Sequence, residues 1–239
     1  MTEPTKTLIE IRNLRLQLAG RDVLNIDHLS ITRGEVTLVV GENGSGKTSL
    51  LKVIAGLHTS TEAQFFCLGA ELEGKKVARF CRGRHVYLHQ TPYLFDGTVE
   101  DNIVYGLRLR GQPRSQCQLE ARDALSWAQL DHLTHRDVRA LSTGERHRVA
   151  LTRAKVLSPS LLLLDEITAN MDTESRQRTY HLIADLKRGG ASVLFATHDQ
   201  ASLEGINDRT LKMHQGTIET AATGSIVVPL RNGTSTQGN

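Results

Sequence analysis

Residues 41–48 have the types and spacing needed to bind the phosphate groups of a nucleotide. They read Gly-Glu-Asn-Gly-Ser-Gly-Lys-Thr and fit the pattern G-x-x-x-x-G-K-[ST], in which glycines let the backbone curl around an anion. In such a loop Lys47 contacts the β- and γ-phosphates, and the hydroxyl of Thr48 contacts Mg²⁺. The alternative is a glycine turn followed by an ordinary surface lysine, and the neighbouring elements argue against it.

A buried strand and a helix are expected on either side of this loop. Residues 36–40 are apolar and rich in valine, as a strand buried on both faces would be, and leucine or isoleucine recurs at helical spacing after the loop until Gly56. A helix that begins at the loop would direct the positive end of its dipole at the anion. We therefore expect a nucleotide to be bound by Gly41, Glu42, Asn43, Gly44, Ser45, Gly46, Lys47, Thr48 and Ser49.

Two carboxylates follow another buried strand. Residues 161–164 are four leucines, and they are followed by Asp165 and Glu166. Beside a phosphate loop, Asp165 is placed to hold Mg²⁺ through water, and Glu166 is placed to accept a proton from the water that attacks the γ-phosphate. Because a lone Asp-Glu pair after a strand is more often a solvated strand end, this prediction depends on the phosphate loop.

Polar residues also follow two other expected strands. Residues 85–89 precede Gln90, and residues 192–196 precede the segment that contains His198. Residues 173–188 read as a helix, so strand and helix alternate as they do in a doubly wound parallel sheet, where ligands bind at the carboxyl ends of the strands. Taken alone, His198 would be typical of a structural histidine. We expect four side chains to meet at this edge: Lys47, Gln90, Asp165 and His198.

The first part of the chain has the pattern of antiparallel strands. Apolar and polar residues alternate over residues 8–18 up to Gly20, and residues 23–31 and 64–68 also read as strands. These segments predict an antiparallel β layer before and after the phosphate loop.

The middle of the chain has a helical pattern. It extends from Pro92 to about Ala140, with residues 111–113 as a break and Ser115 as the cap of a following helix. Together with the phosphate loop, the alternating strands and helices and the β layer, this pattern predicts an α/β fold: a P-loop NTPase (RecA-like) core with an N-terminal antiparallel β layer and an inserted α-helical subdomain. We expect the nucleotide-binding core at 1–90 and 158–222, the helical subdomain at 91–157, and a flexible tail at 223–239.

The segment 141–145, Leu-Ser-Thr-Gly-Glu, is the most diagnostic part of the sequence. Ser142 followed by Glu145 forms a capping box, and Ala150 and Ala154 mark one face of the helix after it. A well-capped helix would explain the serine and the glutamate but not the whole string, which lies 20 residues ahead of Asp165. In this string the chain resembles the ATP-binding-cassette (ABC) family, whose signature is Leu-Ser-Gly-Gly-Gln or Glu followed by an arginine-rich helix.

The resemblance covers nearly the whole chain and implies ATP as substrate and Mg²⁺ as cofactor. It implies that Gln90 contacts Mg²⁺ or the attacking water, that His198 contacts the γ-phosphate, and that Asp172 lies in a loop that crosses a dimer interface. In the family, the signature helix of one copy points at the nucleotide held by the other copy, which implies a head-to-tail homodimer. A capped helix start with a glycine suits such an anion site. The residues that would act in trans are Ser142, Thr143, Gly144 and Glu145.

Three residues depart from the pattern of the family. Thr143 replaces the first signature glycine, and Ile167 replaces the usual proline after the Asp-Glu pair. Leu18 stands where an aromatic residue commonly stacks on adenine. None of the three changes removes a catalytic group.

Charge and cysteine content limit the classes of partner and the compartment. With 29 basic and 26 acidic residues the net charge is +3, so nucleic acid is not expected as the main partner. The three cysteines lack zinc or disulfide spacing, which favours a reducing cytoplasm. The sequence has neither a signal peptide nor a run of roughly 20 apolar residues, so we expect a soluble chain on the inner face of the cell membrane.

The segment 87–99, continued by 105–111, is similar to the ATPase subunit of bacterial tungstate importers. Phosphate and polar amino-acid importers share much of it. The resemblance implies transmembrane permease subunits and a separate extracytoplasmic solute-binding protein. Tyr93 and Phe95 close to Gln90 form a candidate docking surface for the permease, with core packing as the alternative. The 41 residues after His198 leave no room for the β-rich extension of molybdate and sugar importer ATPases.

Two other classes of protein remain as alternatives. One is a soluble ABC ATPase of translation or DNA repair, but neither a second cassette nor a long coiled-coil insert is visible. The other is a different phosphate-loop enzyme such as a kinase, which has no use for a second phosphate-contacting helix supplied in trans.

Overall fold

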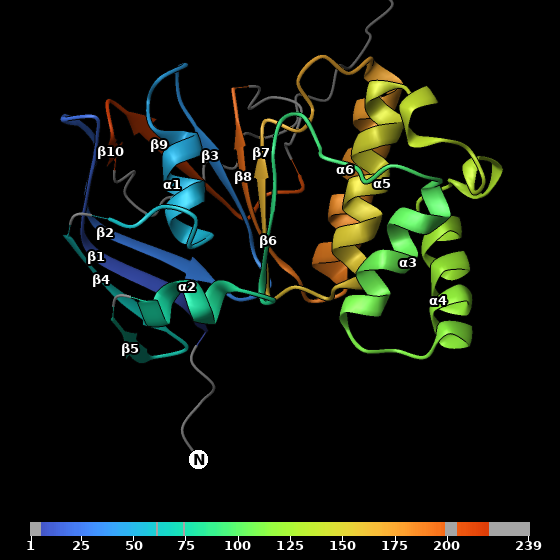
Figure 1. Ribbon diagram of the computed structural model, residues 1–239. Helices are drawn as coiled ribbons and strands as arrows, with labels where there is room; N and C mark the ends of the chain where they lie inside the picture. Colours follow the sequence, from blue (N-terminus) through green and yellow to red (C-terminus); the bar gives the residue numbers. More distant parts are fainter. Residues whose placement is uncertain (1–5, 61, 74, 199–204, 220–239) are drawn as a thin grey trace, which may run out of the picture.

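The computed structural model describes residues 6–60, 62–73, 75–198 and 205–219 (Figure 1). The expected flexible tail, residues 223–239, lies outside the described residues. None of the described helices has the length and apolarity that crossing a membrane requires.

The β layer is a four-stranded antiparallel sheet with the order β2-β1-β4-β5. Its first two strands are joined at Gly20, whose φ of 75° suits the tight turn, and Ile11 lies opposite Leu29 in their register. The alternating pattern of the sequence is confirmed, because Leu14 and Leu16 are buried while Gln17 is exposed. The strands are β1 (Thr7–Leu18), β2 (Arg21–Thr32), β4 (Glu62–Cys67) and β5 (Ala70–Leu72).

The second sheet has six strands in the order β10-β9-β3-β8-β7-β6. The five strands from β9 to β6 are parallel, and β10 pairs antiparallel with β9. Every residue of β3, β7 and β8 is buried, as the continuous apolar runs predict. The strands are β3 (Val36–Val40), β6 (His85–Leu88), β7 (Leu161–Asp165), β8 (Ser192–Thr197), β9 (Arg209–His214) and β10 (Thr217–Glu219).

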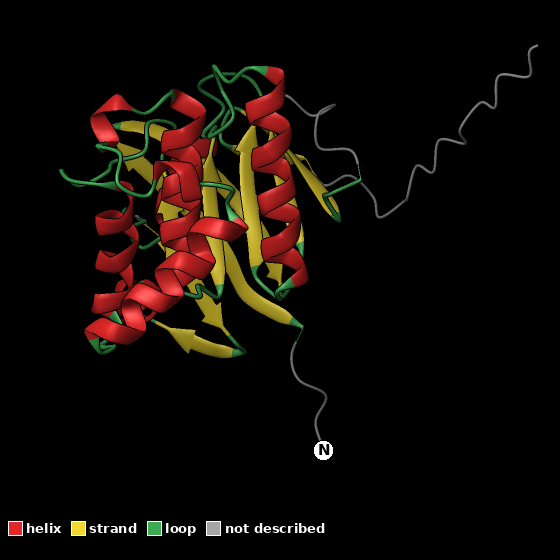
Figure 2. Ribbon diagram, turned by 90° about the vertical axis from the view of Figure 1, so that its right-hand side faces the viewer, coloured by secondary structure: helices red, strands yellow, loops and turns green. Residues whose placement is uncertain are grey.

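Helices cover both faces of the parallel sheet. The helix α1 lies between the two sheets, and α3, α4, α5 and α6 gather on the opposite face (Figure 1), where they lie in front of the strands in Figure 2. The helices are α1 (Lys47–Ile54), α2 (Lys75–Cys81), α3 (Val99–Leu109), α4 (Arg114–Trp127), α5 (Thr143–Val156) and α6 (Thr173–Arg188), with short 3₁₀ turns at η1 (Asp131–Leu133) and η2 (Val138–Ala140).

Each buried strand therefore serves two hydrophobic clusters. In β7, Leu162 and Leu164 pack in the cluster that contains the helices α3–α6, whereas Leu161 and Leu163 pack with α1 and the antiparallel sheet. Burial of each such leucine contributes about 1.5–3 kcal/mol. The leucines of β7 thus pack on both faces of the sheet, and the strand ends with Asp165 at the carboxyl edge of the sheet.

The expected cap of α4 is wrong. The helix begins at Arg114 with Pro113 as its N-cap, and no side chain caps it. Proline has a φ near that of a helix and no N–H group to satisfy, so the helix starts two positions earlier than expected and Ser115 lies inside its first turn. The elements β5, α2, β9 and β10 were not expected from the sequence.

Candidate functional site

The four expected side chains follow four strands that are neighbours in the parallel sheet. The strands β6, β7, β8 and β3 adjoin in that order, and they lead to Gln90, Asp165, His198 and Lys47 respectively. Because parallel strands end at the same edge, the sheet brings these residues to one side of the molecule. The clustering expected from the sequence is therefore found.

The phosphate loop depends on its glycines. Gly46 is the N-cap of α1 with a φ of 105°, and α1 has no side-chain cap. A Cβ on Gly41 would lie 2.3 Å from the carbonyl oxygen of Met213, so only glycine fits beside β9. The N–H groups that begin α1 thus receive no bond from a capping side chain, which leaves them available to an anion.

Lys47 is held inside this loop. Its side chain is 5% exposed, and its Nζ donates to the carbonyl oxygens of Gly41 at 2.7 Å and Glu42 at 3.0 Å. The same Nζ lies 3.5 Å from Oε1 of Glu166. The ammonium group is therefore fixed between the phosphate loop and the carboxylate that follows β7.

Asp165 links its own strand, β7, to the helix α1 and the strand β6 through its two oxygens. Its Oδ1 accepts a hydrogen bond from the hydroxyl of Thr48 at 3.0 Å, and its Oδ2 accepts one from the hydroxyl of Tyr87 at 2.7 Å. Burial, together with this bond to the carboxylate, raises the pKa of Tyr87 well above its usual value. Tyr87 therefore stays protonated and orients Asp165.

The donors at this position fit Mg²⁺. A hydroxyl and a carboxylate are hard oxygen ligands, and Mg²⁺ is commonly bound by one or two carboxylates together with substrate phosphates. Within the described part of the chain, no group of three or more His, Cys, Asp or Glu side chains is arranged to hold a metal by itself. Thr48 and Asp165 would thus hold the ion jointly with a nucleotide.

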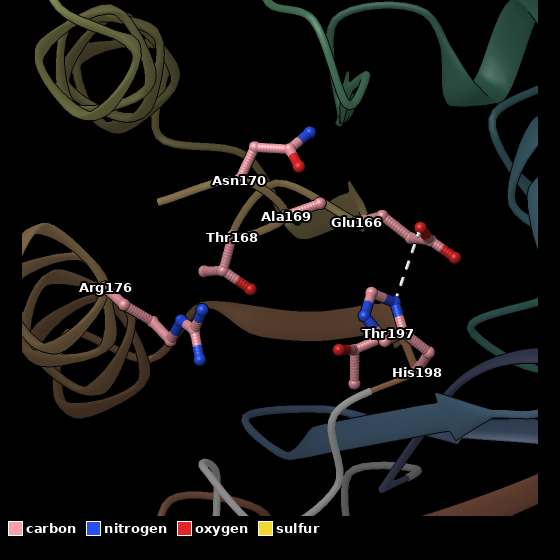
Figure 3. Close-up of a pocket in the computed structure, with 7 residues that line it drawn as sticks. All are labelled: Glu166, Thr168, Ala169, Asn170, Arg176, Thr197 and His198. Carbon is pink, nitrogen blue, oxygen red and sulfur yellow. Dashed lines mark ion pairs between the residues drawn. The ribbon is translucent and has the colours of Figure 1, made fainter. Parts of the chain in front are cut away.

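Glu166 has an unusual backbone. Its φ of 49° lies in the left-handed region, and its N–H donates to the carbonyl oxygen of Ala196 at 2.9 Å. Such a conformation costs about 1–3 kcal/mol in a residue other than glycine and is found preferentially at functional sites. It directs the carboxylate between Lys47 and His198, whose Nδ1 lies 3.6 Å from Oε2 (Figure 3).

Two adjoining cavities open beside this carboxylate. The first has a volume of about 400 Å³ and is lined by Glu42, Asn43, Gln90, Glu166, Ala169, Asn170 and His198. The second, of about 360 Å³, is lined by Glu166, Thr168, Ala169, Asn170, Arg176, Thr197 and His198 (Figure 3). Glu166 and His198 border both, so a water or phosphate group in either cavity could reach them.

The signature segment, residues 141–145, lies outside the lining of both cavities. Ser142 caps α5: its Oγ accepts from the N–H of Glu145 at 3.3 Å, and Oε2 of Glu145 accepts from the N–H of Ser142 at 2.7 Å. Burial alone would raise the pKa of Glu145, but the bonds with Ser142 bring it below its usual value. Ser142 and Thr143 are exposed, and no residue of the segment lines either cavity.

Gly144 and Asp172 fix α5 against α6. A Cβ on Gly144 would lie 2.6 Å from Oγ of Ser175, so the close approach of the two helices requires glycine. Asp172 caps α6 through a 2.8 Å bond from the N–H of Ser175, and these bonds lower the pKa of Asp172. Asp172 is exposed, so capping and a contact with another copy are compatible.

Leu18 ends β1 with 37% of its surface exposed. It lies two residues beyond Leu16, which pairs with Leu24, and Leu24 in turn packs within 2.9 Å of the position that a Cβ on Gly46 would occupy. The end of the hairpin is therefore near the phosphate loop. A contact between Leu18 and a base stays a prediction.

Tyr87 and Arg176 are two site residues that sequence reasoning missed. Tyr87 had a detectable signal, because it lies near the end of the strand that precedes Gln90. Arg176 had none, since its place beside the cavity depends on how α6 packs.

Comparison with known proteins gives one family for the chain. Residues 24–169 match the family described as ABC transporter. A Fe(3+) ions import ATP-binding protein of Escherichia coli (strain K12) is 31% identical over 216 residues, which are 89% of this chain and 61% of that protein. A sulfate/thiosulfate import ATP-binding protein of Pseudomonas syringae pv. tomato is 36% identical over 220 residues, covering 88% of this chain and 66% of that protein. The chain thus spans less than two thirds of these relatives.

Solved structures show the same fold. The cbiO1 protein from Clostridium perfringens, described as part of the ABC transporter complex cbiONQ, superposes with a TM-score of 0.82 at 24% identity, covering 90% of this chain and 87% of that one. The ADP conformation of MJ1267, described as an ATP-binding cassette, has a TM-score of 0.77 at 24% identity, with 90% of each chain covered. The P-loop NTPase type of fold expected from the sequence is confirmed.

Proposed function

Because this chain belongs to the ABC transporter family, we propose that it hydrolyses ATP to ADP and phosphate as the energising subunit of an importer. The observation that carries the proposal is the position of the Glu166 carboxylate, 3.5 Å from the Lys47 ammonium and 3.6 Å from the His198 ring, beside the pair of Thr48 and Asp165. A phosphate loop, a metal-binding pair and a base then meet at one sheet edge.

The residues of the chain divide the work of hydrolysis. Lys47 and the N–H groups at the start of α1 offset the negative charge of the β- and γ-phosphates. Glu166 accepts a proton from water as the water oxygen bonds to the γ-phosphorus and the bond to ADP breaks, while Gln90 and His198 orient the water and the γ-phosphate. When bound, Mg²⁺ supplies charge neutralisation at the phosphate oxygens.

A second copy of the chain would complete the site. The capped start of α5 is exposed and outside both cavities, so it is free to meet a nucleotide bound to another phosphate loop. We expect a head-to-tail homodimer with two composite sites, in which Ser142 to Glu145 act in trans and Asp172 lies at the interface.

The solute that we propose is an oxyanion. Relatives named as sulfate/thiosulfate importers are 34–36% identical to the chain, compared with 30–31% for those named as Fe(3+) importers. The resemblance of residues 87–99 to tungstate importers makes tungstate our specific choice. The solute itself would be selected by a separate solute-binding protein and by the permease.

The permease would dock on an aromatic patch formed by Tyr93, Phe95 and Tyr105. Tyr93 is 73% exposed and Tyr105 is 44% exposed, whereas Phe95 is half-buried between them, with ring centroids 5.5 Å and 4.4 Å away. Leu109 adds a side chain that is 65% exposed. An exposed aromatic cluster only a few residues from Gln90 suits a partner that must sense ATP, and it would hold the chain at the inner face of the membrane.

The test of ATP hydrolysis uses Glu166→Gln. This substitution keeps the shape of the side chain but removes the base, so steady-state phosphate release should fall by roughly 10² or more while a fluorescent ATP analogue still binds. Near-normal phosphate release by this variant would contradict the role of Glu166. Omitting Mg²⁺ from the wild-type assay should also abolish turnover.

The test of the docking patch uses Phe95→Ala. Assembly with a permease, or transport, should be impaired while the isolated subunit keeps its melting temperature, because the ring contributes to an interface rather than to the core. If Phe95→Ala also lowers the melting temperature of the isolated subunit, core packing would be favoured as the role of Phe95. If no permease associates with the wild-type chain, the alternative hypothesis of a soluble ABC ATPase would be favoured.

A further inference from the structure

A buried histidine joins the signature helix to the segment that contains Gln90. His147 lies on α5 with only 3% of its surface exposed. Its Nδ1 is 2.8 Å from the carbonyl oxygen of Thr143, and its Nε2 is 2.9 Å from the carbonyl oxygen of Gln90. Both ring nitrogens therefore face backbone acceptors, one in the first turn of α5 and the other 57 residues earlier in the chain.

This geometry differs from that of a histidine that merely fills the core. The ring of His147 spans the gap between two backbone carbonyl groups, and each ring nitrogen lies within hydrogen-bonding distance of one of them. Leucine at this position would lose both contacts, whereas the side-chain amide of glutamine keeps a donor for one of the two carbonyl groups.

A second side chain of α5 holds the same segment. Arg153, six residues after His147, donates from Nη2 to the carbonyl oxygen of Tyr93 at 2.7 Å, and its guanidinium lies 5.1 Å from the ring centroid of Phe95. The segment from Gln90 to Phe95 is therefore attached to α5 at two points. The point nearer to the start of α5 is the one that holds Gln90.

We propose that His147 is a positioning residue that couples the two halves of the composite ATP site. Gln90 belongs to the site formed by its own phosphate loop, whereas the start of α5 belongs to the site of the other copy. A displacement of the Gln90 backbone on ATP binding is passed through His147 to Thr143 and changes the position of the helix start. This inference rests on the proposed ATP hydrolysis and on the head-to-tail dimer.

The test compares His147→Leu and His147→Gln with His181→Leu, a control at an exposed histidine on α6. Loss of the contacts of both ring nitrogens should lower kcat in His147→Leu by roughly tenfold, with a smaller change in KM for ATP. The Hill coefficient for ATP should also fall toward one. His147→Gln, which keeps a donor, should recover part of kcat, and His181→Leu should behave as the wild type.

Two results would overturn the proposal. One is wild-type kcat and cooperativity in His147→Leu. The other is a loss of kcat in both His147 variants that is accompanied by a lower melting temperature in both, as a packing role would give. If His147→Leu does not fold, the Gln variant decides the matter, because unchanged cooperativity there would contradict the coupling.

Hydrogen exchange separates this proposal from the proposed function. In the Glu166→Gln background, ATP with Mg²⁺ should slow exchange at residues 90–95 and at the first turn of α5 together, and His147→Gln should uncouple the two. Protection that stays coupled in the variant would refute the role of His147. An absence of any ATP-dependent protection in the His147 wild-type background would instead refute nucleotide binding.

Discussion

The two helix starts that we propose to contact phosphate are built in opposite ways. At α1, Gly46 occupies the N-cap with a left-handed φ and no side chain caps the helix. At α5, Ser142 and Glu145 satisfy each other's N–H groups in a complete capping box. The first helix start has no side-chain cap, so a ligand can supply its missing partners, whereas the second already has a capping box before any ligand arrives.

The difference indicates which start binds nucleotide first. The open N–H groups of α1 and the ammonium of Lys47 give this end a positive potential that an anion would neutralise. The capped start of α5 can add its hydroxyl and its dipole but has fewer free donors. We therefore expect ATP to bind at α1 of one copy and then to recruit α5 of another.

The largest effect on ATP binding is expected from Gly46→Ala. A side chain at a φ of 105° is strained, and its Cβ would lie 2.9 Å from Cδ2 of Leu24. Strain of about 1–3 kcal/mol in the loop corresponds to roughly 5- to 150-fold weaker ATP binding in a fluorescent titration. Gly83→Ala is the control, since Gly83 also has a positive φ but has open space around it. Equal affinities in the two variants would contradict the account.

A smaller effect is expected from Ser142→Ala at the other helix start. Loss of the cap should cost about 1 kcal/mol and lower Tm by roughly 2–4 °C. ATP binding to a single chain should stay unchanged, while turnover should fall roughly tenfold because one contact to the trans phosphate is lost. Thr98→Ala removes the equivalent capping box of α3 and is the matched control. Equal losses of turnover in both variants would reduce Ser142 to a structural cap.

The smallest effect is expected from Leu18→Tyr. Leucine offers no π-face to adenine, and aromatic pairing contributes roughly 0.5–1.5 kcal/mol, so tyrosine should tighten ATP binding about two- to tenfold. For the same reason the wild-type chain should discriminate weakly between ATP and GTP. Unchanged or weaker binding in a folded Leu18→Tyr variant would mean that another side chain covers the base.

The parts of the fold that were predictable are those in which one segment carries its own signal. The apolar runs of β3, β7 and β8 must be buried on two faces, and the helix at Thr173–Arg188 has both its cap and its closing glycines in the local sequence. The short edge strand β10 has no buried residue among its three, so no pattern marked it. The local pattern also favoured Ser115 as the cap, because Pro113 was assigned to the break before the helix and not to its N-cap.

The site residues also divide into those that a short motif predicts and those that depend on contacts between distant parts of the chain. Lys47, Asp165 and Glu166 were predictable because each stands in a short motif with a known geometry. The partner of Asp165, Tyr87, lies 78 residues away, and the partner of His147 lies 57 residues away. No spacing along the sequence encodes such contacts, since they depend on the order of strands in the sheet and on helix packing.

The central claim is that one ATP site is assembled from α1 of one copy and α5 of another. Sedimentation of the Glu166→Gln variant tests it most directly, because ATP is bound there without being consumed. With ATP and Mg²⁺ the mass should double from the single-chain value of 26.4 kDa, and it should return to that value when ATP is removed. A mass that stays at one chain, at ATP concentrations that saturate the phosphate loop, would contradict the account.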